Sequence, residues 1–234
     1  MKEAIVLAGG LGTRMRPFTL DAPKPMLVIA GKPFLEYLLT HLKNGQVDRV
    51  ILSIGYLGEQ IQDYFGDEWL GMELAYVAED EPLGTGGAIV KCLMVAQSEH
   101  VFVFNGDTLC TVSLDDMLSL HLSKKAEFTQ ALKLLYDFER YGSVVLDGFR
   151  IVDYREKMFM EKGLINTGVY LLDRRFMMGQ VFPEKFSFEV DFLQKKLLSI
   201  RGVGYTSDAY FIDIGVMEDY EKAQAELPRV IGLS

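Results

Sequence analysis

The sequence of 234 residues contains little cysteine and no excess of positive charge. Cys92 and Cys110 lie inside apolar runs, without C-x-x-C spacing or a nearby histidine, which predicts buried, reduced thiols rather than a metal site. Lys and Arg number 24 against 33 Asp and Glu, a net charge of −9, and no dense basic run could neutralise a nucleic-acid backbone. Nucleic acid is therefore not an expected partner, and any phosphate is expected to bind at one local site.

The chain also lacks a long hydrophobic segment. The apolar run near the N-terminus stops at Ala8, which is too short for a signal-peptide core, and no later run has the length needed to span a bilayer. We therefore expect a cytoplasmic protein without a membrane partner. No linker, repeat or low-complexity tract divides the sequence, and its 49% hydrophobic content is typical of a globular chain. A single domain over residues 1–234 is predicted.

The first half of the chain alternates between strand-like and helix-like segments. Strands are expected at residues 4–8, 49–54, 73–78 and 101–104, and helices at residues 33–44, 59–65 and 87–97. Such alternation predicts an α/β fold of the Rossmann-like, three-layer α/β/α type, with a mainly parallel (mixed) central sheet and helices on both faces. Ligands bind such folds at the carboxyl ends of the strands.

The second half is less regular. Ser113 and Asp116 predict a capped helix that ends near Lys124. Further strands are expected at residues 127–135, 143–146, 150–154, 165–172, 204–206 and 210–214. Further helices are expected at residues 187–200 and at residues 218–227, where Pro228 ends the last helix. We interpret this half as a mixed extension of the same sheet that walls a substrate pocket.

A glycine-rich segment, LAGGLGTRMRPFT from Leu7 to Thr19, follows the first predicted strand. It fits neither G-x-G-x-x-G, because Met15 stands where the third glycine belongs, nor the P-loop pattern. Its glycines let backbone N–H groups approach a ligand, while Arg14, Arg16 and the Lys24 of DAPKPM supply cationic donors. The segment therefore suits a polyphosphate; the alternative is a glycine turn with solvated basic side chains.

Two carboxylates end predicted strands. Asp107 follows the apolar run VFVFN, and Asp213 closes YFI in YFIDIG. A carboxylate at the ligand-bearing edge of a sheet is well placed to bind Mg²⁺, which takes one or two protein carboxylates and completes its shell with phosphates and water. For Asp107 the alternative is a turn formed by Asn-Gly-Asp. Together with the cationic glycine loop, the pair favours a metal-assisted phosphoryl site.

The ordered motifs LAGGLGTRMRPFT with PKPM, EPLGTGGAI, NGD, EK, NTG and FIDIG resemble those of the sugar-1-phosphate nucleotidyltransferases, over residues 7–220. These enzymes join a nucleoside triphosphate to a sugar 1-phosphate and release pyrophosphate. The resemblance implies that the glycine segment is the triphosphate-binding signature. It also implies a nucleotide-binding part at about residues 1–110 and a sugar-phosphate-binding part at about residues 111–220.

The resemblance implies roles for individual residues. Arg14 would steady the leaving pyrophosphate, Lys24 would offset charge at the α-phosphate, and Asp107 and Asp213 would hold Mg²⁺, so that Arg14, Lys24 and Asp107 are the implied catalytic residues. The implied nucleotide-binding residues are Leu7, Ala8, Gly9, Gly10, Gly12, Thr13, Glu79, Gly84 and Thr85. The implied sugar-phosphate-binding residues are Tyr141, Gly142, Glu156, Lys157, Asn166 and Thr167.

Several of these motifs have a structural alternative. Tyr141-Gly142 could be a turn, Glu156-Lys157 a solvated ion pair, and Asn166-Thr167 part of an ordinary bulge. Met158 and Met217 stand where the family commonly has proline, which bears on loop rigidity more than on chemistry. Glu189 and Asp191 either reach the sugar or favour a helix N-terminus, and we prefer the second reading.

The expected substrates follow from the resemblance and from one side chain. The small size, EPLGTGGAI and SFEVDF are most similar to the heptose 1-phosphate guanylyltransferases; mannose 1-phosphate guanylyltransferases, N-acetylmuramate 1-phosphate uridylyltransferases and a noncatalytic regulatory subunit are the alternatives. Glu79 stands where thymidylyl members typically carry glutamine, and an ionised carboxylate can accept the two adjacent donors of guanine. GTP is therefore the favoured nucleotide. The oligomeric state is not predicted.

Overall fold

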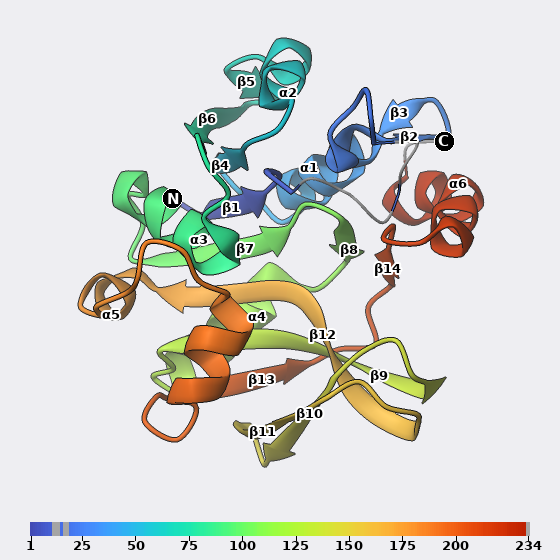
Figure 1. Ribbon diagram of the computed structural model, residues 1–234. Coiled ribbons are helices and arrows are strands. Elements are labelled where there is room, and N and C mark those ends of the chain that lie inside the picture. Colours follow the sequence, from blue (N-terminus) through green and yellow to red (C-terminus); the bar gives the residue numbers. More distant parts are fainter. Residues whose placement is uncertain (11–14, 16–18, 233–234) are drawn as a thin grey trace.

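The computed structural model describes residues 1–10, 15 and 19–232 (Figure 1). The strands of the central sheet are β1 (Glu3–Leu7), β4 (Arg49–Ile54), β5 (Glu68–Trp69), β6 (Met72–Ala78), β7 (His100–Asn105), β9 (Phe128–Phe138), β10 (Ser143–Asp147), β11 (Arg150–Arg155), β12 (Met160–Asp173) and β13 (Gly202–Thr206). They form one ten-stranded sheet in the order β10-β11-β13-β9-β12-β7-β1-β4-β6-β5. Strands from both halves of the chain therefore share one sheet.

The sheet is mixed, as predicted, and its parallel part lies mainly in the first half of the chain. Strands β7, β1, β4 and β6 run parallel to one another. The second half joins through β12, which is antiparallel to both β7 and β9, while β13 is parallel to β9. Two small sheets lie apart from it: β2 (Val28–Ile29) with β3 (Lys32–Pro33), and β8 (Thr108–Cys110) with β14 (Phe211–Asp213).

Helices cover both faces of the sheet. They are α1 (Phe34–Asn44), α2 (Gly58–Phe65), α3 (Gly84–Val95), α4 (Leu114–Ser123), α5 (Arg174–Met178) and α6 (Met217–Ile231), with a 3₁₀ turn at Lys24–Met26 and a π-helix at Phe188–Gln194. Side chains of β1 alternate between the faces. Ala4 and Val6 belong to the core under α1, α2, α4 and α6, whereas Ile5 belongs to the core under α3, α5 and the π-helix. The three-layer prediction is therefore confirmed.

Two predicted helices differ from those observed. Residues 187–200 were expected to form one helix, but the segment begins as a π-helix, in which Phe188 and Leu193 are both fully buried. The wider π turn places these two residues, five positions apart, against the same core. The last helix does not end at Pro228 but continues to Ile231, because Ile231 is buried beside Leu227 and Gly232 caps the helix with a left-handed φ of 71°.

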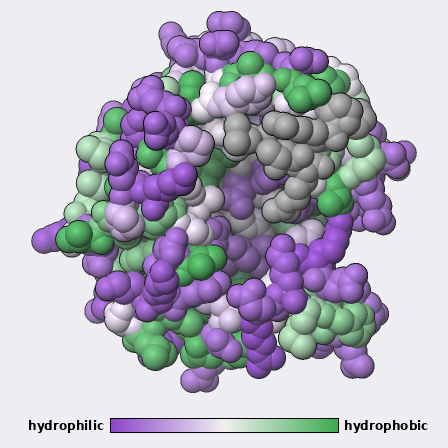
Figure 2. All heavy atoms as spheres, viewed as in Figure 1, coloured by the Kyte–Doolittle hydropathy of each residue, from purple (hydrophilic) through white to green (hydrophobic). Residues whose placement is uncertain are grey.

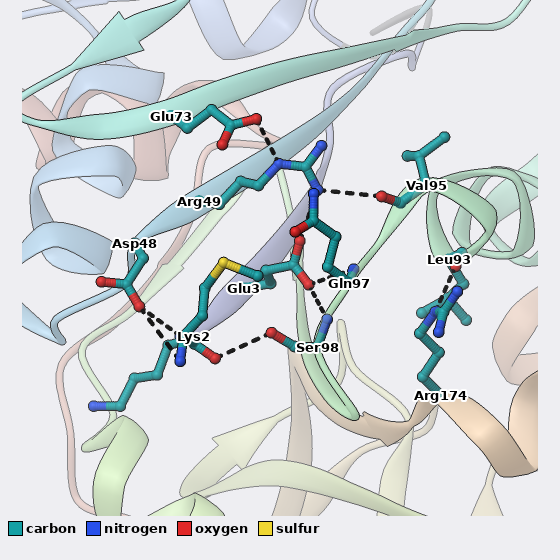
Figure 3. Close-up of polar contacts among 11 residues, drawn as sticks. Lys2, Glu3, Asp48, Arg49, Glu73, Leu93, Val95, Gln97, Ser98 and Arg174 are labelled. Atoms are coloured by element: carbon teal, nitrogen blue, oxygen red, sulfur yellow. Dashed lines mark hydrogen bonds and ion pairs between the residues drawn. The ribbon is translucent and has the colours of Figure 1, made fainter.

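A polar network ties the strands together at their amino ends (Figure 3). The fully buried Glu3 accepts a hydrogen bond from Arg49 at 2.7 Å and others from the amides of Gln97 and Ser98, while Arg49 also donates to Glu73 at 2.8 Å. Burial raises the pKa of Glu3, but these hydrogen bonds outweigh it and hold the pKa below its usual value. Strands β1, β4 and β6 are thus joined to the connection before β7.

The two cysteines are buried and unpaired, as predicted. Burial raises the pKa of Cys92 to about 12 and that of Cys110 to about 11, so both thiols stay protonated at neutral pH. Among the described residues, no helix combines the length and the apolar character that crossing a membrane requires.

Candidate active site

A cavity of about 490 Å³ lies at the carboxyl ends of β1 and β7. Figure 2 shows a hollow near the centre of the face that Figure 1 also views. The lining residues are Leu7, Ala8, Gly9, Gly10, Met15, Lys24, Pro25, Glu79, Pro82, Gly84, Thr85, Ala88, Asn105, Gly106, Asp107 and Asp213. The cavity thus lies at the strand ends, where the site was predicted. Its lining includes the predicted Gly9, Gly10, Lys24, Asp107 and Asp213.

Tight backbone packing shapes the wall of the cavity beside β1. The amide of Gly106 donates to the Leu7 carbonyl at 3.0 Å, and a Cβ at Gly106 would lie 2.5 Å from that oxygen. A Cβ at Gly9 would lie 2.9 Å from the Glu79 carboxylate. A Cβ at either position would therefore force a neighbouring group to move, so glycine permits the close packing of this wall.

The Glu79 carboxylate, which packs against Gly9, is held by two hydrogen bonds. Its Oε1 accepts from the Ser53 hydroxyl at 2.8 Å, and its Oε2 accepts from the Leu83 amide at 3.1 Å. Helix α3 then begins at Gly84, whose φ is 71° and where a Cβ would lie 2.5 Å from the Phe186 carbonyl oxygen. Glu79 therefore both lines the cavity and holds the turn that leads into α3.

The two aspartates meet because β8 pairs with β14. This pairing sets Asp213 opposite Thr108, and the Ile214 amide donates to the Asp107 carbonyl at 3.1 Å. Lys24 Nζ lies 2.6 Å from Asp107 Oδ2. Burial and the Asp107 charge raise the pKa of Asp213, while Lys24 and the Gly215 amide act in the opposite direction.

This donor set fits a hard divalent cation. Two carboxylates converge at the edge of an open cavity, and a lysine ammonium already neutralises one of them. In the part of the chain that the structure describes, no group of three or more His, Cys, Asp and Glu side chains could hold a metal. A cation here would thus depend on substrate oxygens or water to complete its coordination, as Mg²⁺ typically does.

The predicted sugar-phosphate motifs gather around the start of β10. Ser143 pairs with Arg155 of β11 on one side and with Ile165 of β12 on the other. This register brings together the residues flanking these three positions, which are Tyr141, Gly142, Glu156, Lys157, Asn166 and Thr167. Three motifs distant in sequence are therefore neighbours, although none of them lines the cavity described above.

Contacts link this group to the aspartates. The Tyr141 ring packs edge-on against Phe211 of β14 at 5.9 Å, and burial followed by the charge of Asp213 raises the pKa of Tyr141 to about 12. Thr167 is fully buried and donates to the Ala131 carbonyl at 2.9 Å, so its side chain supports β12 rather than facing a ligand. Glu156 and Lys157 are exposed in the connection between β11 and β12.

Some predicted residues cannot be placed and some lining residues were not predicted. Gly12, Thr13, Arg14 and Arg16 lie outside the described residues. Asn105, Gly106 and Pro25 belong to the recognised NGD and PKPM motifs, so the motifs themselves could have indicated them. The buried Met15 carries no sequence signal that separates it from an ordinary core residue.

Together, the α/β sheet, the strand-end cavity and the ordered motifs are those of a nucleotide-binding protein. The model of the nucleotidyl transferase family matches residues 3–229, and the chain belongs to that family. It is 47% identical to D-glycero-alpha-D-manno-heptose 1-phosphate guanylyltransferase of Aneurinibacillus thermoaerophilus, over 98% of this chain and 100% of that protein. It is 45% identical to the enzyme of the same name from Campylobacter jejuni, over 93% of this chain and 96% of that protein.

A solved structure agrees with this assignment. The crystal structure of HddC from Yersinia pseudotuberculosis complexed with GMP-PN superposes with a TM-score of 0.86 at 37% identity, and the match covers 96% of this chain and 98% of that one. The predicted family resemblance is therefore confirmed by sequence and by fold.

Proposed function

We propose that this chain is a sugar-1-phosphate guanylyltransferase that condenses GTP with D-glycero-α-D-manno-heptose 1-phosphate and releases pyrophosphate. The observation that carries the proposal is the cavity in which glycine-rich backbone, Glu79, Lys24 and the Asp107–Asp213 pair converge. The names of the two relatives described above, at 47% and 45% identity, support guanine and heptose as the particular substrates.

The proposed binding mode assigns the nucleotide to the cavity. Leu7 to Gly10, with Gly12 and Thr13, would contact the triphosphate and nucleoside, and Gly84 and Thr85 would flank the base. Glu79 would accept the N1–H and N2–H donors of guanine, since each carboxylate oxygen has a lone pair beyond those used by Ser53 and Leu83. The sugar 1-phosphate would lie toward Tyr141, Gly142, Glu156, Lys157 and Asn166, with the buried Thr167 supporting β12 beside Asn166.

The chemistry needs positioning and charge neutralisation. The second pKa of a phosphomonoester is about 6, so the attacking oxygen of a sugar 1-phosphate is already anionic near neutral pH, and no general base is required. Lys24 would neutralise charge at the α-phosphate, and Arg14 would stabilise the leaving pyrophosphate. Asp107 and Asp213 would hold Mg²⁺, which when bound supplies further charge neutralisation to the phosphates.

A pyrophosphate-release panel tests the proposal. Five nucleoside triphosphates are crossed with heptose, mannose and N-acetylmuramate 1-phosphates, in the presence of Mg²⁺. The expected result is the highest kcat/KM for GTP with the heptose 1-phosphate. If the enzyme prefers mannose 1-phosphate or UTP, the proposed substrates are wrong. If no pair of substrates releases pyrophosphate, a noncatalytic binding role is favoured. The Asp107→Asn variant serves as the background control.

A further inference from the structure

Glu189 of the π-helix lies where two polar arms from opposite parts of the proposed site meet. One arm is the hydrogen bond to Thr85, which lines the nucleotide cavity. The other runs through Tyr170 to Asn166, one of the proposed sugar-phosphate-binding residues. We propose that Glu189 is a positioning residue whose carboxylate holds both arms and so sets the Asn166 amide for sugar recognition. The inference rests on the proposed function and adds to it a role for Glu189, which the sequence had offered either as a sugar contact or, by preference, as a residue that favours a helix N-terminus.

The nucleotide arm is short. The Thr85 hydroxyl donates to Glu189 Oε2 at 3.1 Å, and the Thr85 oxygen accepts from the Phe188 amide at 2.9 Å. The Thr85 hydroxyl proton is therefore used in the bond to Glu189. Toward the nucleotide, Thr85 can only accept a hydrogen bond or make van der Waals contacts. The contact also fastens the first turn of α3 to the π-helix, which lies 104 positions away in the sequence.

The sugar arm has a fixed direction. The Gly168 amide donates to Asn166 Oδ1 at 2.9 Å, which leaves Asn166 Nδ2 to face the Tyr170 hydroxyl at 2.6 Å. Because Nδ2 is a donor, the Tyr170 oxygen accepts from it, and the Tyr170 proton goes to Glu189 Oε1 at 2.7 Å. One N–H of Asn166 remains available for a ligand hydroxyl.

Tyr170 is suited to transmit this orientation. It is fully buried, its ring packs edge-on against Phe188 at 5.3 Å, and burial together with the Glu189 charge raises its pKa well above the ordinary value. The hydroxyl therefore stays protonated and cannot rotate freely toward water. The orientation of Asn166 then depends on the presence of an acceptor at position 189.

Only an ionised carboxylate satisfies both arms. Thr85 and Tyr170 both donate to it, and an ionised Glu accepts at both oxygens. In Glu189→Gln a single oxygen remains to accept and the amide can turn over, so neither donor keeps a fixed acceptor and the orientation of the Tyr170 hydroxyl is lost. Asp191 offers a matched control two residues away, since its carboxylate bonds to Lys195 and to the Ser187 amide and to neither arm.

The test compares steady-state kinetics of Glu189→Gln, Tyr170→Phe and Asp191→Asn. Tyr170→Phe removes only the sugar arm, so the KM for sugar 1-phosphate should rise about tenfold while the KM for GTP stays within about twofold, since the Asn166 amide loses its buried acceptor and the contact of Thr85 with Glu189 remains. Glu189→Gln should raise the sugar KM by a similar factor, and Asp191→Asn should resemble wild type.

The double variant Glu189→Gln/Tyr170→Phe provides a readout that a merely structural role would not give. Because both changes break the same arm, its sugar KM should be no higher than that of Glu189→Gln alone. An unchanged sugar KM in both single variants would overturn the positioning role. A second outcome would also overturn it: the KM values for sugar 1-phosphate and GTP rise by the same factor, the melting temperature falls, and the two substitutions have additive effects on KM. Glu189 would then only support the fold in general.

The activity of the wild-type protein in the substrate panel shows which of the two proposals fails. If wild type prefers another substrate pair in the panel, the proposed substrates are wrong, and the same ratios are measured with that pair. If wild type acts on GTP and the heptose 1-phosphate while the variants match it, only the role of Glu189 fails. If the wild-type protein releases no pyrophosphate with any substrate pair, both proposals are overturned.

Discussion

Lys24 Nζ and Asp107 Oδ2 form an ion pair at 2.6 Å in a cavity that also contains Asp213. The Lys24 side chain is only 12% exposed, so the ammonium has given up most of its hydration to lie against the carboxylate. In the free protein, Lys24 therefore neutralises a carboxylate that is proposed to bind Mg²⁺. A cation that binds Asp107 must compete with Lys24 for the same oxygens unless substrate phosphates draw the lysine away.

Replacing Lys24 with methionine should strengthen divalent-metal binding to the nucleotide-free protein while lowering turnover. Removal of the ammonium leaves Asp107 and Asp213 as neighbouring like charges, and an added cation then relieves their repulsion. We expect the affinity for Mn²⁺, used as a spectroscopic probe, to increase several-fold in a titration without nucleotide. Lys32→Met, which removes the ion pair between a partly exposed lysine and the largely buried Glu36, is the control. Equal or weaker binding in Lys24→Met would refute the competition.

The aspartate pair should be essential for turnover but not for folding. Asp107→Asn and Asp213→Asn each retain the shape of the side chain and remove the charge, so we expect kcat to fall by at least about 100-fold, the size of loss seen when a key electrostatic contact is removed. The melting temperature should change little. Asp153→Asn, on the exposed surface of β11, is a matched control. Near-normal rates at limiting Mg²⁺ in either folded variant would rule out the metal assignment.

Glu3 should contribute to stability through its buried network. Glu3→Gln removes the charge that pairs with Arg49 and accepts from Gln97 and Ser98, so we expect about 3–5 kcal/mol less stability in urea unfolding, the usual cost of breaking a buried pair. The folded-state pKa of Glu3 is lowered, so its contribution is present above the unfolded pKa and is lost as the pH falls through the folded value. Glu73→Gln, whose side chain is 61% exposed, should cost much less.

The position of the site was predictable from the sequence because strand ends carry its residues. Leu7 to Gly10 and Asn105 to Asp107 each follow a short apolar run in the sequence, and the parallel pairing of β1 with β7 brings their ends to one edge. Asp213 reaches the same site through a different contact, the antiparallel pairing of β14 with β8. The pairing of β8 with β14 was not predictable, because runs of three residues carry too little pattern to specify a partner.

Long-range polar contacts were also beyond the reach of sequence patterns. Glu189 was interpreted as a helix-start residue because local spacing shows only Ser187 and the acidic side chains that follow it. Its partners, Thr85 and Tyr170, lie on α3 and β12, and nothing in their local sequence marks a shared acceptor. The helix beyond Pro228 was missed for a related reason, since the burial of Ile231 is a tertiary effect that outweighs the missing amide donor.

His121 should make the protein less stable in mild acid. It is 1% exposed, and burial, followed by the charge of His100, lowers its pKa to about 4. An unfolded histidine titrates near 6.5, so the unfolded chain binds more protons between about pH 6.5 and pH 4, and stability falls as the pH decreases through this range. His121→Asn should reduce the slope of unfolding free energy against pH by up to about 1.4 kcal/mol per pH unit, measured by urea unfolding. An unchanged slope would contradict a neutral buried His121.

Glu79→Gln should reduce the preference for GTP over UTP by about 1–3 kcal/mol in kcat/KM, because an amide presents one donor where guanine needs acceptors. The change also affects the protein itself, since Glu79 accepts from Ser53 and from the Leu83 amide, so part of any loss could come from a shifted turn before α3. Ser53→Ala separates the two effects: it removes one support of Glu79 and leaves the carboxylate in place. We expect Ser53→Ala to lower kcat/KM for both nucleotides by similar factors, whereas Glu79→Gln should change their ratio. An unchanged ratio in Glu79→Gln would assign base recognition to the backbone of Gly84 and Thr85 instead.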